Sequence, residues 1–196
     1  MEMIRVDTGA FPLAFGRTLK HEGGFDNDPA DPGGMTFMGV SREYHPGWPG
    51  WPIVDAELKR CGPPCLSLNS DLTLQVRLFY FTEFWQRLQC DFVATLSTEV
   101  AAELFDTGVN MGRTRAVEIL QRALNLLNRN KKLYPDLVDD GLMGRNTRGT
   151  LAKYFELGMD ERILLKLMNH LQGEYYINLM RRFPEKERFA GWFART

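Results

Sequence analysis

The sequence lacks an excess of charge of either sign, any long apolar run and any low-complexity segment. Its 24 basic and 25 acidic residues give a formal net charge of −1, so there is no electrostatic case for nucleic acid or an anionic membrane surface as a partner. No run approaches the roughly 18 apolar residues of a membrane span. The start of the chain lacks a basic segment, a long apolar centre and a small-residue cleavage site, so we expect no secretory signal.

Cysteine is scarce and odd in number. Cys61 and Cys65 flank a Gly-Pro-Pro turn in "RCGPPC", and Cys90 stands alone. We expect small buried thiols in a reducing compartment, with a Cys61–Cys65 bridge after export as the alternative. A zinc site would need His45 or another donor beside them, and no metal-ligand spacing is present, so we predict no metal.

The chain has the composition of a globular protein with a sizeable core, at 44% hydrophobic and 25% charged residues. Apolar residues recur at helical spacing along most of it. The stripes are Phe11, Phe15 and Leu19; Leu74, Leu78, Phe81, Trp85 and Leu88; Val117, Leu120, Leu124 and Leu127; and Leu164, Met168, Leu171, Tyr175 and Leu179. The alternating segment "MTFMGV" predicts one small strand or hairpin. The fold class predicted is therefore mainly α, with a small β-hairpin near the front.

Residues 19–40, "LKHEGGFDNDPADPGGMTFMGV", place several carboxylates directly after the first apolar helix. Glu22 shares the face of Phe11, Phe15 and Leu19, so packing of the helix partly removes its carboxyl from water and raises its pKa. A helix C-terminus disfavours negative charge, so the position of Glu22 at the end of the helix also raises its pKa. A carboxylic acid that is neutral near neutral pH can donate a proton to a leaving oxygen.

The loop that follows offers a second carboxylate in a wetter setting. One protonated and one ionised carboxyl form the pair that glycoside hydrolysis uses. The plainer interpretation is a solvated glutamate followed by an ordinary turn. The spacing argues against a calcium-binding EF-hand loop, because the twelfth position counted from Asp26 is Phe37 rather than Glu, and the sixth is Asp31 rather than Gly.

The segment "HEGGFDNDPADPGGMTFMGV" closely resembles the glutamate-containing signature of glycoside hydrolase family 108, the lysozymes (N-acetylmuramidases) of phages and bacteria. Downstream, "FTEFWQRL" and "ELFDTGVNMGRTRAVEILQRAL" resemble the family's aromatic helix and its Val-Asn-x-Gly and Leu-Gln run. "DDGLMGRNTRGTL" and "RFAGWFAR" resemble the predicted peptidoglycan-binding region at its C-terminus. The resemblance covers residues 11–196 and implies a lysozyme-like α+β fold with a C-terminal helical lobe.

The resemblance implies that Glu22 is the catalytic glutamate. In the broader phage-type lysozymes, a Glu is followed by an Asp after eight intervening residues and by a Thr after five more. Here Asp31 follows Glu22 after eight, and Thr36 follows Asp31 after four. Asp31 and Thr36 are therefore the expected catalytic partners, and Asp28 remains a competitor because the Asp-Pro turns could present either carboxylate.

Four more residues are candidates for binding substrate. Trp48 and Trp51 lie in a Pro/Gly loop, where their rings either stack on sugars or anchor local packing. Asp106 and Asn110 lie four residues apart before Gly112. The resemblance favours a cleft wall opposite Glu22 for this pair, and helix capping or turn formation is the alternative.

We divide the chain into a lysozyme-like catalytic region, residues 1–97, and a helical lobe, residues 98–196, which we expect to complete the same compact domain. The expected activity is cleavage of the β-1,4 bond between N-acetylmuramic acid and N-acetylglucosamine, without metal or cofactor. A lytic transglycosylase and a non-enzymatic peptidoglycan-binding protein are the rivals. The expected partner is the peptidoglycan glycan strand, without nucleic acid or a membrane span.

We expect a monomer that is made in a bacterial cytoplasm and acts on the cell wall in the periplasm. A phage endolysin released by a holin and a secreted antibacterial effector both fit this expectation. An effector would be paired with an inhibitor or immunity protein. The sequence does not choose between the two.

Overall fold

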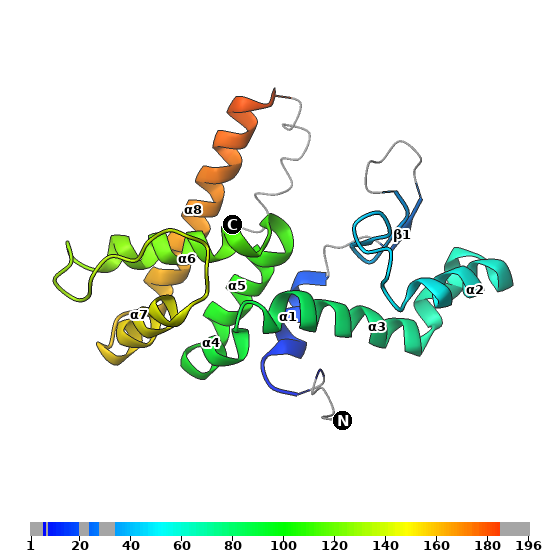
Figure 1. Cartoon of the computed structure of the whole chain (residues 1–196), viewed down its shortest axis with the longest axis horizontal. Coiled ribbons are helices and arrows are strands. Elements are labelled where there is room, and N and C mark those ends of the chain that lie inside the picture. The colour runs from blue at the N-terminus through cyan, green and yellow to red at the C-terminus, as the bar shows by residue number, and fades with distance from the viewer. Residues whose placement is uncertain (1–5, 7, 20–23, 28–33, 185–196) are drawn as a thin grey trace. The chain divides into compact units, whose positions relative to one another are not determined.

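The computed structural model of the chain describes residue 6 and residues 8–19, 24–27 and 34–184. Within these residues the protein is mainly helical with one small antiparallel sheet, which confirms the predicted fold class (Figure 1). The chain divides into two compact units, Met1–Gln86 and Arg87–Thr196. This division falls slightly before the break that the sequence suggests near residue 97.

The first unit joins short helices to the sheet. Its elements are α1 (Phe11–Thr18), β1 (Phe25–Asp26), β2 (Thr36–Phe37), β3 (Val40–Ser41), α2 (Trp51–Cys61), the 3₁₀ helix η2 (Pro63–Leu68), α3 (Ser70–Tyr80) and the π-helical turn η3 (Phe81–Gln86). Aromatic rings form much of its core. The ring of Phe11 on α1 contacts those of Phe81 and Trp85, with centroids 5.0 and 5.5 Å apart.

Helix α1 is shorter than its apolar pattern predicts. It ends at Thr18, with Leu19 as the C-cap, whereas the pattern extends it to Glu22. Gly16 and the β-branched Thr18 are weak helix formers and explain an early end. Residues 20–23 lie outside the described residues, so the environment of Glu22 stays a prediction.

The apolar stripe predicted over residues 74–88, which spans α3 and η3, is correct only in its second half. Phe81, Trp85 and Leu88 are buried as expected, but Leu74 is exposed, and Leu72 and Val76 are buried in its place. The π-helical turn η3 inserts i→i+5 hydrogen bonding after Tyr80 and rotates the buried face. A single 3.6-residue period therefore could not describe both halves.

The sheet has the order β1-β2-β3, with all neighbours antiparallel. It contains the predicted hairpin, β2 and β3, and adds β1 from the segment just before the Asp/Pro loop. Residues paired across strands share a face. One face therefore carries Phe25, Phe37 and Val40, and the other carries Asp26, Thr36 and Ser41.

The second unit is a bundle of α4 (Cys90–Leu96), α5 (Thr98–Met111), α6 (Arg113–Leu127), α7 (Arg145–Glu156) and α8 (Glu161–Arg182). Helix α5 packs against α4, α6 and α8. The buried core of the second unit includes Val100, Leu104, Phe105, Val117, Leu120, Leu124, Leu151, Tyr154, Leu164 and Met168. At Gly108, an added Cβ would lie 2.6 Å from Leu88 Cδ1, so this glycine permits close packing.

Two helices of the second unit begin at side-chain caps. The Ser97 side chain caps α5 by accepting from the Val100 N–H, and Asp160 caps α8 by accepting from the Arg162 N–H. Helix α7 differs from these two. That helix begins at Arg145 after Gly144, without a side-chain cap.

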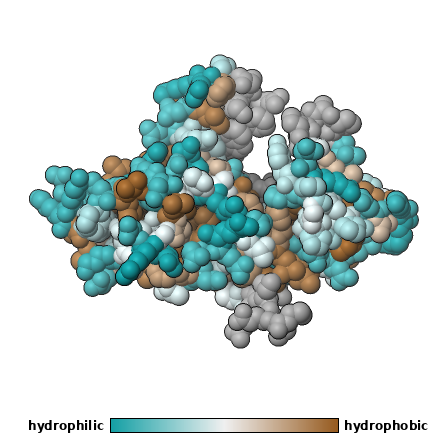
Figure 2. All heavy atoms as spheres, in the orientation of Figure 1, coloured by the Kyte–Doolittle hydropathy of each residue, from teal (hydrophilic) through white to brown (hydrophobic). Residues whose placement is uncertain are grey.

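The stripe predicted on α8 is correct for its first two residues only. Leu164 and Met168 are buried, but the buried residues that follow are Gln172 and Tyr176 rather than Leu171 and Tyr175. No helix among the described residues combines the length and apolar character needed to cross a membrane. On the face drawn in Figure 2, hydrophobic side chains are interspersed with hydrophilic ones in each unit.

Candidate functional site

Three of the predicted site residues, Glu22, Asp28 and Asp31, lie outside the described residues. In the sequence, Glu22 precedes β1 by three positions, and Asp28 and Asp31 belong to the connection between β1 and β2. The described part of the candidate site is therefore the small sheet and the side chains that hold it.

The polar face of the sheet presents one row of three oxygen-bearing side chains. Asp26 pairs with Thr36, and Thr36 pairs with Ser41, so Thr36 occupies the middle of the row. Asp26 is exposed and Thr36 is half-buried. The structure thus puts the predicted Thr36 on a polar face beside a carboxylate that sequence reasoning did not select. The alternation of Phe-Asp, Thr-Phe and Val-Ser was the signal available for it.

The turn between β2 and β3 is held by contacts from outside the sheet. Both turn residues, Met38 and Gly39, have positive φ, 45° and 78°, as tight two-residue hairpin turns require. The strain at Met38 is offset by two hydrogen bonds. Its N–H donates to the Gly24 carbonyl, and its carbonyl accepts from the Tyr80 hydroxyl, both at 2.8 Å.

A partly exposed ion pair fixes the chain after β3. The Arg42 guanidinium donates to both carboxylate oxygens of Asp55 on α2, at 2.7 and 2.8 Å, and lies 5.2 Å from the centroid of the Trp51 ring. The hydrogen bond from Arg42 lowers the pKa of Asp55. This fork-shaped contact is a strong, oriented one, so it anchors the sheet to α2.

Trp48 and Trp51 are both buried, 6% and 2% exposed. Their rings meet edge to face with centroids 5.0 Å apart, and their indole N–H groups donate to the carbonyls of Gln75 and His45. Burial favours the packing role for Trp51. Trp48 also lines a pocket of about 570 Å³ formed by residues 44–49 of the loop with α3 and η3, so a sugar-contacting role is retained as a prediction for Trp48 alone.

The second predicted pair is brought together by α5. The Asn110 amide donates to the backbone carbonyl and to Oδ2 of Asp106, both at 2.8 Å, and both side chains are partly buried. Their spacing of four residues along one helix explains the contact. Their place opposite Glu22 stays a prediction.

One titratable residue of α5 escaped the sequence reasoning. Burial raises the pKa of Glu103 to about 7, and the nearby charge of Asp106 adds to the rise. Its Oε1 accepts hydrogen bonds from the Gln172 amide of α8 and from the Thr107 hydroxyl. A glutamate on an otherwise apolar stretch, "VAAELF", was the signal available, but its buried partner comes from 69 residues away.

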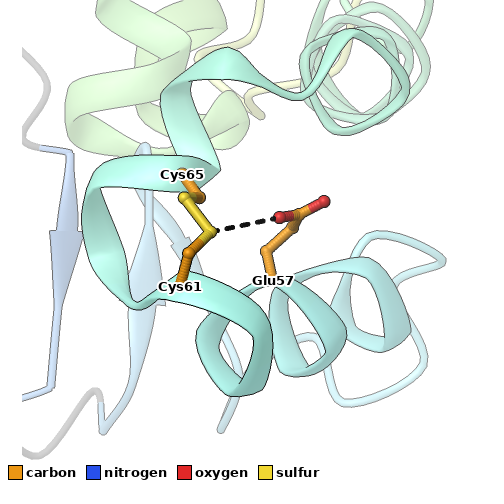
Figure 3. A group of neighbouring side chains, drawn as sticks. All are labelled: Glu57, Cys61 and Cys65. Carbon is orange, nitrogen blue, oxygen red and sulfur yellow. Dashed lines mark hydrogen bonds between the residues drawn. A yellow bond between two sulfur atoms is a disulfide. The ribbon is translucent and has the colours of Figure 1, made fainter.

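Cys61 and Cys65 form a disulfide, so the expectation of free buried thiols was wrong for this pair, and Cys61 is exposed. Figure 3 shows Glu57 beside the bridge, with its Oε2 3.8 Å from Cys61 Sγ. Glu57 also accepts from the side chains of Arg60 and Asn69.

Among the described residues, this trio is the one group whose donor atoms lie close enough to share a metal. With both sulfurs joined, no thiolate is available as a ligand. The group instead ties α2 to the start of α3, which Asn69 caps. His45 packs its ring against Phe79. Cys90 is free and buried, as expected, and burial raises the pKa of its thiol.

Comparison with known proteins gives two family matches. Residues 15–112 match the model described as glycosyl hydrolase 108, and residues 115–196 match the predicted peptidoglycan domain. The fold resembles that of Brucella abortus SagA, with a TM-score of 0.53 at 19% identity, over 95% of this chain and 93% of that one. No curated protein matches the sequence.

Proposed function

Because the chain belongs to glycosyl hydrolase family 108, we propose that it is a muramidase that cleaves the β-1,4 bond between N-acetylmuramic acid and N-acetylglucosamine in peptidoglycan. The observation that carries the proposal is the pair of family matches, a glycosyl hydrolase over residues 15–112 and a predicted peptidoglycan domain over residues 115–196. A peptidoglycan domain joined to a glycosidase indicates that peptidoglycan is the substrate of the glycosidase.

In the proposed mechanism Glu22 acts as the general acid and protonates the glycosidic oxygen as the bond breaks. Asp31 stays ionised and either activates a water molecule or stabilises the oxocarbenium-like centre, which are the two roles of a second carboxylate in glycoside hydrolysis. Thr36 holds the water. The place of Thr36 supports this assignment, because Thr36 lies on the polar face of the strand that follows the Asp31 loop.

The reaction products separate this function from its rivals. Purified peptidoglycan is incubated with the protein, and the soluble fragments are analysed by mass spectrometry. Hydrolysis leaves reducing N-acetylmuramic acid ends, which is the expected result. A lytic transglycosylase leaves 1,6-anhydro ends instead, and a binding protein releases no fragments, so either outcome contradicts the proposal.

We propose the periplasm as the place of action, reached as a phage endolysin through a holin or as a secreted effector. Disulfides persist in oxidising compartments, so the Cys61–Cys65 bridge agrees with a site outside the cytoplasm. A secreted effector would require a cognate inhibitor in the producing cell, and an endolysin would not.

A further inference from the structure

The loop between α6 and α7 is fixed to α6 by a row of amide side chains. Residues 128–144 contain neither helix nor strand, and the loop returns alongside α6 (Figure 1). Gln121, Asn125 and Asn128 follow one another at spacings of four and three, which places them on one side of the helix. All three bond to the returning loop.

These amides pair with the loop much as a neighbouring strand would. Asn125 donates to the Leu137 carbonyl at 2.9 Å and accepts from the Leu137 N–H at 2.7 Å. Gln121 accepts from the Gly141 N–H at 2.9 Å and donates to the side chains of Asp140 and Thr147 at 2.8 and 3.0 Å. Gln121 and Thr147 are buried, so breaking this network would leave buried polar groups without partners.

The same loop carries backbone strain. Arg129, Asn130 and Lys131 have φ values of 54°, 58° and 64°, and left-handed backbone costs a non-glycine residue about 1 kcal/mol. Asn128 and Asp136 hold this turn, since Asn128 Oδ1 accepts from the Lys131 N–H and Asp136 pairs with the Lys131 ammonium at 3.0 Å. Strain of this kind persists where the surroundings fix it, often beside a ligand site.

The fixed loop and α7 enclose a pocket of about 640 Å³, which is within the size range of small-ligand sites. On the α7 side, Arg145, Gly149 and Lys153 lie four residues apart and therefore share a face. On the loop side are the carboxylates of Asp136 and Asp140. The two walls thus carry opposite charge.

The charged side chains that line the pocket differ in whether they already have hydrogen-bond or ion-pair partners. Arg145 is exposed and has no hydrogen-bond or ion-pair partner among the described residues. Lys153 pairs with Glu156 at 3.2 Å, near the surface. Asp136 is 42% exposed beside Lys131, and the hydrogen bond from Lys131 lowers its pKa. Arg145 therefore faces the pocket with its donors unused. Asp136 already accepts from the Asn128 amide at Oδ1 and from the Lys131 ammonium at Oδ2, so a ligand ammonium would use the exposed lone pairs that remain on this carboxylate.

We propose that this pocket binds the peptide stem of peptidoglycan, with a stem carboxylate against Arg145 and a stem ammonium against Asp136. The inference rests on the proposed function, which makes peptidoglycan the substrate. In intact peptidoglycan the lactyl carboxyl of N-acetylmuramic acid is tied up in the amide bond to the stem, so the sugars carry no charge, whereas the stem carries both free carboxylates and an amino group. Only the stem therefore complements two walls of opposite charge.

The test is calorimetric titration of the full chain with an N-acetylated stem tetrapeptide, N-acetyl-L-alanyl-γ-D-glutamyl-meso-diaminopimelyl-D-alanine, in which the only ammonium is that of diaminopimelate, as in peptidoglycan. Arg145→Glu should raise the Kd at least tenfold. Arg162→Glu is the matched control, since Arg162 is also in the first turn of a helix, has a 91% exposed side chain and does not line the pocket. It should leave the Kd unchanged. An equal loss in both variants would overturn the assignment.

A second variant blocks the pocket without altering charge. A Cβ at Gly149 would meet no atom within 4 Å, and the residue is exposed in the middle of α7, so Gly149→Leu should fold and even gain helix propensity. Its side chain would occupy the pocket and abolish tetrapeptide binding. Unchanged tetrapeptide binding by this variant would contradict a stem site.

Digestion of sacculi by the wild-type protein keeps the two proposals apart. Digestion without tetrapeptide binding would refute the stem pocket and leave the hydrolase intact. Tetrapeptide binding that depends on Arg145 and Gly149, without digestion, would refute the hydrolase and support the pocket.

Discussion

At the scale of single residues, Glu103 links the stability of the second unit to pH. Its pKa is about 7 in the folded protein against an ordinary 4.5, because burial disfavours the ionised form. The folded state therefore holds this proton more tightly than the unfolded state. The stabilisation is full below pH 4.5 and is lost as the pH rises through 7, by roughly 3 kcal/mol over that window.

We predict that Glu103→Gln flattens this dependence. The variant keeps an oxygen that accepts from Gln172 and Thr107, but it cannot ionise. Urea unfolding at pH 5 and pH 8 should show a smaller fall in the free energy of unfolding for the variant than for the wild type, and a more stable variant at pH 8. An equal fall in the free energy of unfolding between pH 5 and pH 8 for the variant and the wild type would show that Glu103 does not titrate in this range.

The second carboxylate of the catalytic site is testable by comparing three aspartates. Asp31→Asn should cost far more lytic activity than Asp28→Asn, because only Asp31 has the phage-lysozyme spacing from Glu22. Asp26→Asn, on the exposed end of the polar row, is the control and should stay near wild-type activity. Initial rates on purified peptidoglycan measure all three. An equal or larger loss for Asp28→Asn would make Asp28 the partner.

At the scale of elements, the sequence predicts features that depend on near neighbours in the chain, but not features that depend on partners far away in the chain. Caps such as Ser97 and Asp160 are recognisable in a sequence, because the group that each one satisfies lies two or three residues away. Leu74 was misplaced because the π-helical turn rotates the buried face of α3. Gln172 was missed because a buried amide looks polar in sequence, and its partner, Glu103, lies on another helix.

The candidate site also has features that the sequence predicts and features that it does not. The helix-loop-strand order around Glu22 and the place of Thr36 near a small hairpin follow from local patterns. The pairing of β1 with β2, which brings Asp26 beside Thr36, depends on strand register. Register is fixed by the apolar face of the sheet and by the turn, and two-residue strands are too short to show it in sequence.

The β2–β3 hairpin gives a prediction at this scale. Tyr80→Phe removes the hydroxyl that donates to the Met38 carbonyl, and with it a contact that holds a strained turn. The free energy of unfolding in urea should fall by about 1 kcal/mol. Tyr44→Phe, at a 70% exposed tyrosine, is the matched control and should have no effect. A stability change shared by both variants would remove the hairpin contact from the account.

At the scale of the whole molecule, we predict that the helical lobe completes the catalytic domain. The glycosyl hydrolase match extends to residue 112, so a cut after residue 97 removes α5 and with it Asp106 and Asn110. Residues 1–97 expressed alone should be insoluble or unfolded by circular dichroism, and inactive on cell walls. A soluble, active fragment would reduce the C-terminal half to a targeting module.

The most direct test of the central claim is the rate of Glu22→Gln on purified peptidoglycan. The substitution keeps the side-chain volume and removes the proton donor. General acid catalysis contributes about 10²–10⁴-fold, so the initial rate of muropeptide release should fall at least that far while the circular dichroism spectrum and thermal midpoint stay those of the wild type. A folded variant that releases muropeptides at a near wild-type rate would remove Glu22 from the mechanism.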